Sequence, residues 1–289
     1  MSMRDGAPTY RLLDSGGRRK LEECGGFRLV RPAPQAVWAA ELPRAEWERF
    51  DAEYLRSRDG GGEWNFRRGL PAGWPIEIGG LELELRATGF GHVGVFAEQV
   101  PAWGRIESWC RSMPPGGEVL NLFAYTGGST LAAARGGARV CHLDASQGVV
   151  KWARANAARS GLGAAPIRWI VDEASKFVRR EVRRNRTYRG LVLDPPSFGR
   201  GPRGEVFKIE QDLPLLLEDL GKLLDPDPEF VLLSAHSPGF SPLVLKHLVS
   251  DLLGDRRERG TLQAEEMCVE CAGRVLPSGA RAWWERRES

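Results

Sequence analysis

The chain has 289 residues, 42% hydrophobic and 27% charged, an ordinary globular composition that excludes wholesale disorder and fits one large domain, or one of ordinary size plus a small one. Its 41 basic and 38 acidic residues leave a net charge of +3, which excludes nonspecific polyanion binding and restricts any nucleic-acid contact to a local patch. No apolar run approaches the roughly 18 residues that span a bilayer, and the N-terminus has no signal-peptide core, so we expect a soluble cytoplasmic protein.

The five cysteines are odd in number and scattered, which does not suit a disulfide scaffold. Cys268 and Cys271 form a lone C-x-x-C in a segment of strand character, where residues three apart face opposite ways. No second cysteine pair or nearby histidine completes a zinc site. We therefore expect small hydrophobic residues here, and no metal or redox site.

Residues 1–90 are expected to form a small, mostly-β module. TYRLLD, KLEEC and FRLVRP have strand character and are separated by SGG and GG turn signals. LELELR (81–86) alternates strictly, and Gly79-Gly80 predicts a hairpin that joins it to PIEI. Between these strands, residues 43–58 resemble a short helix and residues 60–62 a loop.

Residues 91–289 alternate between strand and helix patterns, which predicts an α/β, doubly wound sheet. A first helix spans 101–113, and two strands close the series at 261–271 and 274–285. Between them, strands are expected at 118–125, 139–145, 167–172, 188–194 and 229–235, and helices at 127–137, 146–161, 173–185, 207–224 and 241–253. PPSFGRG (195–201) is expected to be a loop.

Candidate ligand-binding residues follow the first three strands of this sheet, at the carboxyl ends where such folds bind ligands. Gly127 and Gly128 let the backbone approach a ligand and open a helix whose N–H groups favour an anion, although a packing turn is the alternative. Asp144 and Asp172 end the next two strands, and the alternative for each is a helix cap. An acid at the end of the second strand accepts hydrogen bonds from a ribose diol. Together these strand ends describe a nucleoside with a charged tail.

The fourth strand ends in Asp194, followed by Pro195, Pro196, Ser197 and Phe198. Two consecutive prolines fix a rigid bend that has no N–H donors, so carbonyl oxygens and the Asp194 carboxylate remain as acceptors. Phe198 can offer a ring face to a planar base. A stiff loop with a capped aspartate is the alternative interpretation.

The motifs N-x-F-A-Y-T-G-G, strand-end Asp144 and D-P-P-S-F resemble those of class I S-adenosylmethionine-dependent methyltransferases. GHVGVFAEQ upstream and GEVFKIEQDLPLLL downstream narrow the resemblance to bacterial large-subunit ribosomal RNA methyltransferases that modify cytosine C5 or guanine N7. The resemblance covers roughly residues 88–240. It implies a seven-stranded sheet with an antiparallel last hairpin, over 91–289, and S-adenosyl-L-methionine as the cofactor.

The resemblance also implies the roles of individual residues. The cofactor's methionine part would lie on the 125–129 loop, its ribose on Asp144 and its adenine near Asp172, with the base to be methylated at Asp194–Phe198. Phe96 and Gln99 would border the cofactor. The full set of implied cofactor contacts is Phe96, Gln99, Phe123, Tyr125, Thr126, Gly127, Gly128, Ser129, Asp144, Ala145, Ser146, Asp172, Glu173, Ala174 and Asp194, and the catalytic candidates are Asp194, Pro195, Phe198 and His236.

This sequence departs from the family in two places: it has no evident PUA-type RNA-binding module, and residues 234–238 read SAHSP where cytosine-C5 enzymes carry a catalytic cysteine. C5 transfer needs a thiolate that attacks C6, so we favour a nitrogen acceptor in an RNA base, with ribosomal RNA as the expected substrate. His236 either accepts a proton or is structural, and Lys208 either contacts phosphate or ends a helix. Methylation of a protein or small molecule, and a non-catalytic binding module, are the competing functions.

Two arginine-rich features have competing interpretations. The basic run at 179–189 is better explained as a solvated helix end on the side of the sheet opposite the ligand. Six of the ten tryptophans lie in the first 113 residues, and three of them, Trp38, Trp64 and Trp74, are near Arg28, Arg31, Arg67 and Arg68 in sequence. These residues either form a surface for RNA or fill the core of a small β module.

Overall fold

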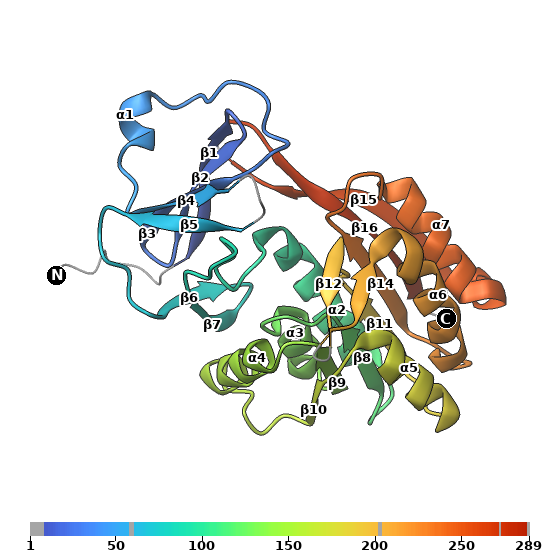
Figure 1. Ribbon diagram of the computed structural model, residues 1–289. Coiled ribbons are helices and arrows are strands. Elements are labelled where there is room, and N and C mark those ends of the chain that lie inside the picture. Colours follow the sequence, from blue (N-terminus) through green and yellow to red (C-terminus); the bar gives the residue numbers. More distant parts are fainter. Residues whose placement is uncertain (1–8, 58–60, 202–203, 272, 288–289) are drawn as a thin grey trace. The chain divides into compact units, whose positions relative to one another are not determined.

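The computed structural model describes residues 9–57, 61–201, 204–271 and 273–287 (Figure 1). The chain divides into a first unit, residues 1–100 with 268–277, and a second unit, residues 101–267 with 278–289. The division at residues 90/91 expected from the sequence stays a prediction. The stretch examined for a signal peptide falls largely on residues 1–8, which lie outside the described residues. The predicted 60–62 loop begins at Gly60, which also lies outside them, and Gly62 is already the first residue of a strand.

The first unit is built on a five-stranded sheet in the order β1-β2-β3-β4-β5. Neighbouring strands are antiparallel except for β3 and β4, which run parallel. The strands predicted at TYRLLD, KLEEC and FRLVRP are confirmed as the first three. The bounds are β1 (Tyr10–Gly16), β2 (Arg19–Cys24), β3 (Phe27–Pro32), β4 (Ala52–Arg56) and β5 (Gly62–Phe66).

The helix predicted over residues 43–58 is wrong beyond its first turn. The structure has α1 (Arg44–Trp47) and then the strand β4. Trp47 and Phe50 pack against Leu21 and Val30 of the sheet, so the apolar residues meet a neighbouring layer without a continuous helix. The later residues of the segment, in β4, pair with both β3 and β5, and this pairing outweighs their local helical pattern.

The predicted hairpin before residue 86 is confirmed as β6 (Trp74–Ile78) and β7 (Leu81–Leu85). Leu81, Leu83 and Leu85 are all buried, as their alternation predicts. Gly79 and Gly80 have φ of 58° and 71°, the left-handed values that a two-residue hairpin turn requires at both positions. A short helical turn, η1 (Ala97–Gln99), ends this part of the unit.

The second unit contains a seven-stranded sheet in the order β10-β9-β8-β11-β14-β16-β15. The first five strands are parallel, whereas β16 runs antiparallel to β14. This confirms the predicted seven-stranded sheet with an antiparallel last hairpin. The bounds are β8 (Glu118–Leu122), β9 (Arg139–Asp144), β10 (Ile167–Val171), β11 (Gly190–Leu193), β14 (Phe230–Ala235), β15 (Gly260–Val269) and β16 (Leu276–Arg286).

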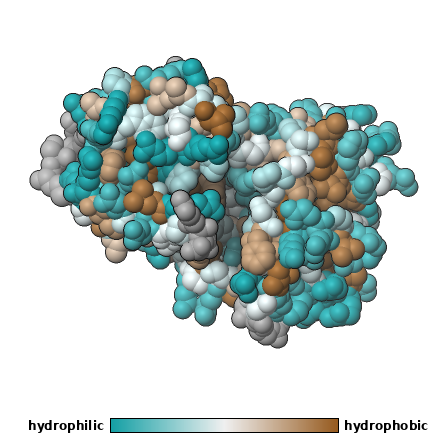
Figure 2. Space-filling view, turned by 45° about the horizontal axis from the view of Figure 1, so that its top comes forward, coloured by the Kyte–Doolittle hydropathy of each residue, from teal (hydrophilic) through white to brown (hydrophobic). Residues whose placement is uncertain are grey.

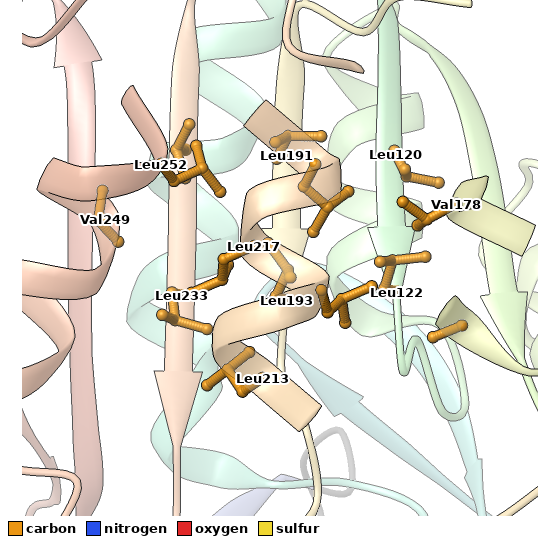
Figure 3. Close-up of a cluster of buried hydrophobic side chains, with 14 of the residues drawn as sticks. Leu120, Leu122, Val178, Leu191, Leu193, Leu213, Leu217, Leu233, Val249 and Leu252 are labelled. Atoms are coloured by element: carbon orange, nitrogen blue, oxygen red, sulfur yellow. The ribbon is translucent and has the colours of Figure 1, made fainter. Parts of the chain in front are cut away.

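Helices cover both faces of this sheet, which makes it doubly wound (Figure 1). One face carries α2 (Val100–Ser112), α3 (Gly128–Arg135) and α4 (Gln147–Arg159), and the other carries α5 (Ala174–Arg183), α6 (Ile209–Leu223) and α7 (Pro242–Leu253), followed by η2 (Gly254–Arg259). Figure 3 shows Leu213 and Leu217 of α6 over Leu193 and Leu233 of the strands, where they form the main core.

The predicted loop at 195–201 is only partly a loop. Phe198–Arg200 form β12, which pairs with β13 (Val206–Lys208) in a short antiparallel hairpin. Two three-residue strands separated by glycines give little periodicity, so the local pattern does not reveal them. Of the helices in the described part of the chain, none is both long and apolar enough to cross a membrane.

Candidate functional site

The candidate residues of the second unit follow strands that run in the same direction, so they lie at one edge of the sheet. Chain order reverses between β8 and β11, where folds of this kind bind ligands. The loop 123–127 follows β8, Asp144 ends β9, and Asp172 follows β10. Asp194 follows β11 and His236 follows β14. The sheet therefore places these predicted site residues at its carboxyl edge.

The loop after β8 has an unusual backbone. Phe123 and Tyr125 have φ of 56° and 47°, in the left-handed region that non-glycine residues rarely adopt and that is enriched at functional sites. The backbone N–H of Tyr125 donates to Oδ2 of Asp144 at 3.0 Å, and Nδ2 of the buried Asn156 donates to the carbonyl oxygen of Thr126 at 3.0 Å. Side chains from the end of β9 and from within α4 thus fix the shape of this loop.

The two glycines of the loop have separate structural reasons. Gly127 has φ of 95° and precedes the first turn of α3. A Cβ atom on Gly128 would lie 2.1 Å from Cζ2 of Trp103, so this glycine lets α3 approach α2 closely. The packing interpretation therefore accounts for Gly128. The neighbouring Ser129 is half-buried in the first turn of α3.

Asp144 lies where the second strand meets this loop. Its Oδ1 accepts a hydrogen bond from the N–H of Ser146 at 2.9 Å, while its Oδ2 accepts the bond from Tyr125. Burial raises the pKa of this carboxyl, and the backbone donors oppose that shift. The cap of α4 is Ser146, whose Oγ accepts from the N–H of Val149 at 3.4 Å. Between them lies Ala145, which is half-buried.

The residues after the third strand already have partners within the unit. The carboxylate of Asp172 forms an ion pair with Arg180 and accepts a bond from the N–H of Glu173. The carboxylate of Glu173 caps α5 by accepting from the N–H groups of Ser175 and Lys176, each at 2.8 Å. Ala174 is buried in the main core. Glu173, and not Asp172, is therefore the helix cap.

Asp194 is joined to the loop that follows β14. The hydroxyl of Ser234 donates to Oδ1 of Asp194 at 2.7 Å, and Nε2 of His236 lies 3.5 Å from the same oxygen. Nδ1 of His236 is 2.7 Å from the carbonyl oxygen of Ser278 in β16. Pro195, the residue that follows Asp194 in the sequence, is buried. The structure thus brings together Asp194 and His236, which are 42 positions apart.

A second contact joins the same two loops further along. The hydroxyl oxygens of Ser197 and Ser237 are 2.6 Å apart. Further along the first of these loops, the ring of Phe198 is 52% exposed. Phe198 pairs across the hairpin with Lys208, and the guanidinium of Arg200 lies 5.6 Å from the centroid of the Phe198 ring. An exposed aromatic ring with two cations beside it is suited to a base and its phosphates.

Phe96 and Gln99 belong to the first unit, where they bracket η1. The N–H of Gln99 donates to the carbonyl oxygen of Phe96 at 3.1 Å, and Gln99 is buried. The ring of Phe96 makes an edge-to-face contact with His92, with centroids 5.2 Å apart. Their expected place beside the cofactor stays a prediction.

Several residues of the two arginine-rich features have structural roles. Arg184, Arg186 and Arg189 of the basic run form ion pairs with Glu181, Glu118 and Glu229. In the first unit Trp74 is buried and donates to the carbonyl oxygen of Cys24, and Arg31 is buried in an ion pair with Glu22. The core interpretation is therefore correct for Trp74 and Arg31.

Three of the residues that fix the site carry little sequence signal. Asn156 lies inside a helix, Arg180 lies eight positions after the acid that it pairs with, and Ser234 is the second-last residue of a buried strand. The sequence singled out the segment 234–238 only because it lacks the cysteine of cytosine-C5 enzymes, and it assigned no role to Ser234. Their partners lie on other elements, so the contacts follow from the tertiary fold.

Comparisons with known proteins identify the family and the fold. A family model described as S-adenosylmethionine-dependent methyltransferase matches residues 33–250. The chain is similar to a crystallised SAM-dependent methyltransferase from Agrobacterium tumefaciens, with 37% identity and a TM-score of 0.91 over 98% of this chain and 92% of that one. It shares the fold of SMU.776, crystallised with S-adenosylhomocysteine, with 19% identity and a TM-score of 0.74 over 96% of this chain and 75% of that one.

A search of curated proteins gives relatives that are much longer than this chain. The ribosomal RNA large subunit methyltransferase K/L of Shewanella baltica is 32% identical over 154 residues. The match covers 53% of this chain and 21% of the relative. The aligned part is therefore about a fifth of that protein.

Proposed function

The chain belongs to the S-adenosylmethionine-dependent methyltransferases, and we propose that it methylates a base nitrogen in ribosomal or other RNA. The observation that carries this proposal is the cluster of Asp194, Ser234 and His236, beside a loop that ends in the exposed ring of Phe198. The curated relatives act, by their names, on the RNA of the large ribosomal subunit. With such a substrate we expect the chain to work in the cytoplasm.

The residues at the carboxyl edge of the sheet fit the cofactor. Asp144 is fixed by two backbone donors at a strand end, in the position of the acids that bind ribose hydroxyls. We place the methionine part on residues 125–129, the adenine near Asp172 and Glu173, and Phe96 and Gln99 at the border. When bound, the cofactor supplies a methyl group activated by a sulfonium.

Asp194 is suited to orient a nitrogen acceptor. An exocyclic amino group must have its hydrogens held by acceptors, so that its lone pair points at the methyl carbon. The carboxylate of Asp194 and the carbonyl oxygen of Pro195 supply such acceptors, and positioning of this kind contributes a large part of catalysis when two reactants are bound together. Transfer would break the bond between the methyl carbon and the sulfonium sulfur as the N–C bond forms. The amino group would then lose a proton, and Asp194 beside His236 is placed to accept it.

Three of the five cysteines are poor candidates for the nucleophile that the C5 alternative requires. Burial raises the pKa of Cys110 and of Cys141 to about 12, and it raises the pKa of the buried Cys24 as well. A thiol with such a pKa is protonated near neutral pH and is a poor nucleophile. The side chain that lies beside Asp194 at position 234 is the hydroxyl of a serine, and not a thiol.

The experiment is a transfer assay with methyl-labelled S-adenosylmethionine and ribosomal RNA from a strain that lacks this protein. Total protein and a small-molecule extract from the same strain serve as competing acceptors. We expect label in RNA, and nucleoside mass spectrometry should place it on a nitrogen of guanine or adenine. Label in 5-methylcytidine would contradict the nitrogen assignment, and label in protein or small molecules alone would contradict the RNA substrate.

A further inference from the structure

A tight turn in the first unit presents an exposed phenylalanine. The N–H of Gly91 donates to the carbonyl oxygen of Thr88 at 3.0 Å, which closes a turn with Gly89 and Phe90 at its centre. Gly91 has φ of 77°, and the N–H of Arg86 donates to the carbonyl oxygen of Val93 just outside the turn. Phe90 is 78% exposed at the tip.

Three side chains from neighbouring strands hold this turn on the sheet. Nη1 of Arg31 donates to the carbonyl oxygen of Gly91 at 3.0 Å, from β3. The hydroxyl of Tyr54 on β4 donates to the carbonyl oxygen of Gly89 at 2.9 Å. The indole N–H of Trp64 on β5 donates to the carbonyl oxygen of Thr88 at 2.8 Å. These bonds fix the backbone that carries the Phe90 ring, so little backbone entropy is lost when a ligand stacks on it, and the turn is pre-organised for binding.

The same face of the sheet carries further aromatic rings. Tyr54 and Trp64 are cross-strand partners with an edge-to-face contact of 5.3 Å between centroids. Trp64 stacks on Phe66 at 6.2 Å, and Phe66 is 50% exposed. The surface in Figure 2 is mainly hydrophilic with small hydrophobic patches. Phe66 thus stacks on the half-buried Trp64, whose indole N–H holds the turn that carries Phe90. Two exposed phenylalanines arranged in this way are a feature that core packing does not explain.

Arginines lie at both ends of this row of rings. Arg56 is two residues after Tyr54 in β4, so it shares the face, and it is exposed. Arg68 is two residues after Phe66, lies 6.0 Å from the ring centroid of Phe27 and is 57% exposed. Its ion pair with Asp51 is long, at 3.9 Å. We call Tyr54, Trp64, Phe66 and Phe90 with Arg56 and Arg68 the aromatic face.

We propose that the aromatic face binds a single-stranded segment of the RNA substrate. Bases stack on Phe66 and Phe90, and phosphates contact Arg56 and Arg68; rings flanked by guanidinium groups are the combination that single-stranded nucleic acid requires. This inference rests on the proposed function. It refines the prediction of an RNA surface in this region: Trp74 and Arg31 belong to the core, and Phe66 and Phe90 are the contact residues.

The test measures binding of a fluorescein-labelled, unstructured RNA of about 12 nucleotides, a length in the range that single-strand-binding folds cover. Phe66→Ala/Phe90→Ala is compared with Leu55→Ala, which truncates an exposed apolar side chain on the opposite face of β4. We expect the double variant to weaken RNA affinity at least about tenfold, as loss of stacking does, while S-adenosylmethionine affinity stays unchanged. Leu55→Ala should bind like the parent, and Phe90→Trp should retain affinity.

The arginines give a second measurement. Arg56→Gln and Arg68→Gln should each reduce the slope of log affinity against log salt by about 0.7, the value for one phosphate contact with a single strand. A duplex of the same length should compete poorly. Unchanged slopes in both variants would overturn the assignment of these arginines to phosphates.

The outcomes separate this inference from the proposed function. If the parent chain binds RNA and Phe66→Ala/Phe90→Ala binds it equally well, the aromatic face is not the RNA surface and the proposed function stands. If the parent binds S-adenosylmethionine but neither this RNA nor ribosomal RNA, both fail. If the double variant changes only self-association, measured by sedimentation, the face is a contact between copies of the chain and the inference is overturned.

Discussion

Nε2 of His236 faces Oδ1 of Asp194 at 3.5 Å, and the position of the ring is set from its other side. Nδ1 lies 2.7 Å from the carbonyl oxygen of Ser278, which can only accept, so Nδ1 carries a proton. Ser278 belongs to β16, which pairs with β14. The antiparallel last hairpin of the sheet therefore orients the imidazole toward the acceptor loop.

We first predict the effect of Asp194→Asn, which keeps the shape of the loop and removes the charge. For an exocyclic amino acceptor, single-turnover methyl transfer should fall about 100-fold or more, because a preorganised charge is lost where the transition state needs it. For guanine N7 the fall should be much smaller, because that lone pair is already exposed. Ser234→Ala, which removes only the hydroxyl that orients Asp194, should give a smaller loss, and full activity in Asp194→Asn would remove Asp194 from catalysis.

The second prediction concerns the exposed ring of Phe198. Phe198→Ala should lower turnover on RNA while S-adenosylmethionine affinity stays within about a factor of three, because stacking on a base is worth ~1–3 kcal/mol and the ring has no expected role at the cofactor. The matched control is Leu215→Ala, which truncates a 64% exposed apolar residue of α6. Equal turnover in both variants would show that the acceptor base does not stack on Phe198.

The third prediction is that methyl transfer survives replacement of each cysteine in turn by alanine. The reason is chemical: covalent activation of C6 needs a thiolate, and burial holds the pKa of Cys110 and of Cys141 near 12. Each variant is first checked for folding and for cofactor binding. One variant that passes both checks and transfers no methyl group would restore the C5 mechanism.

Much of the carboxyl edge could be predicted because the signals are local. Short apolar runs end in glycine or aspartate at 122–128, 144, 172 and 194, and parallel strands bring such ends to one edge. The contact between Ser234 and Asp194 could not be predicted in this way. It depends on the pairing of β11 with β14, which joins residues 40 positions apart.

The mistaken helix at 43–58 has an equally specific cause. Trp47, Phe50 and Tyr54 are spaced i, i+3 and i+7, which is the pattern of an amphipathic helix. In the structure Trp47 and Phe50 pack with Leu21, whereas Tyr54 lies on the opposite face of the sheet and contacts Trp64. Periodicity cannot distinguish one continuous face from residues that are buried in two separate places.

The fourth prediction concerns the pH dependence of stability. His142 is buried in β9, with Nδ1 2.9 Å from the hydroxyl of Thr130, and burial lowers its pKa from 6.5 to about 3. Between those values the unfolded chain binds a proton that the folded chain does not. The stabilisation is therefore complete above pH 6.5 and is lost as pH falls toward 3, by up to about 1.4 kcal/mol per pH unit.

The measurement is chemical denaturation of the parent and of His142→Gln at several pH values from 7 to 5. The parent should lose about 2 kcal/mol more than the variant over this range, whatever the absolute stability of the variant. His247→Gln, which changes an exposed histidine of α7, should behave like the parent. Parallel curves for the parent and His142→Gln would contradict a neutral, buried His142.

The last prediction tests Asp144, which we place at the cofactor's ribose. Asp144→Ala should weaken S-adenosylmethionine binding by roughly 1–3 kcal/mol, the usual cost of leaving hydrogen-bonding groups unpaired. Part of this loss comes from the loop, because Oδ2 of Asp144 also accepts the N–H of Tyr125. Asn156→Ala separates the two effects: it removes a bond to the same loop, at Thr126, and leaves the carboxylate in place. Calorimetry should therefore show a larger loss for Asp144→Ala than for Asn156→Ala, and a weaker preference for S-adenosylmethionine over its 2′-deoxyribose analogue in Asp144→Ala alone. Equal losses with an unchanged preference would assign Asp144 to the support of the loop and remove it from the ribose site.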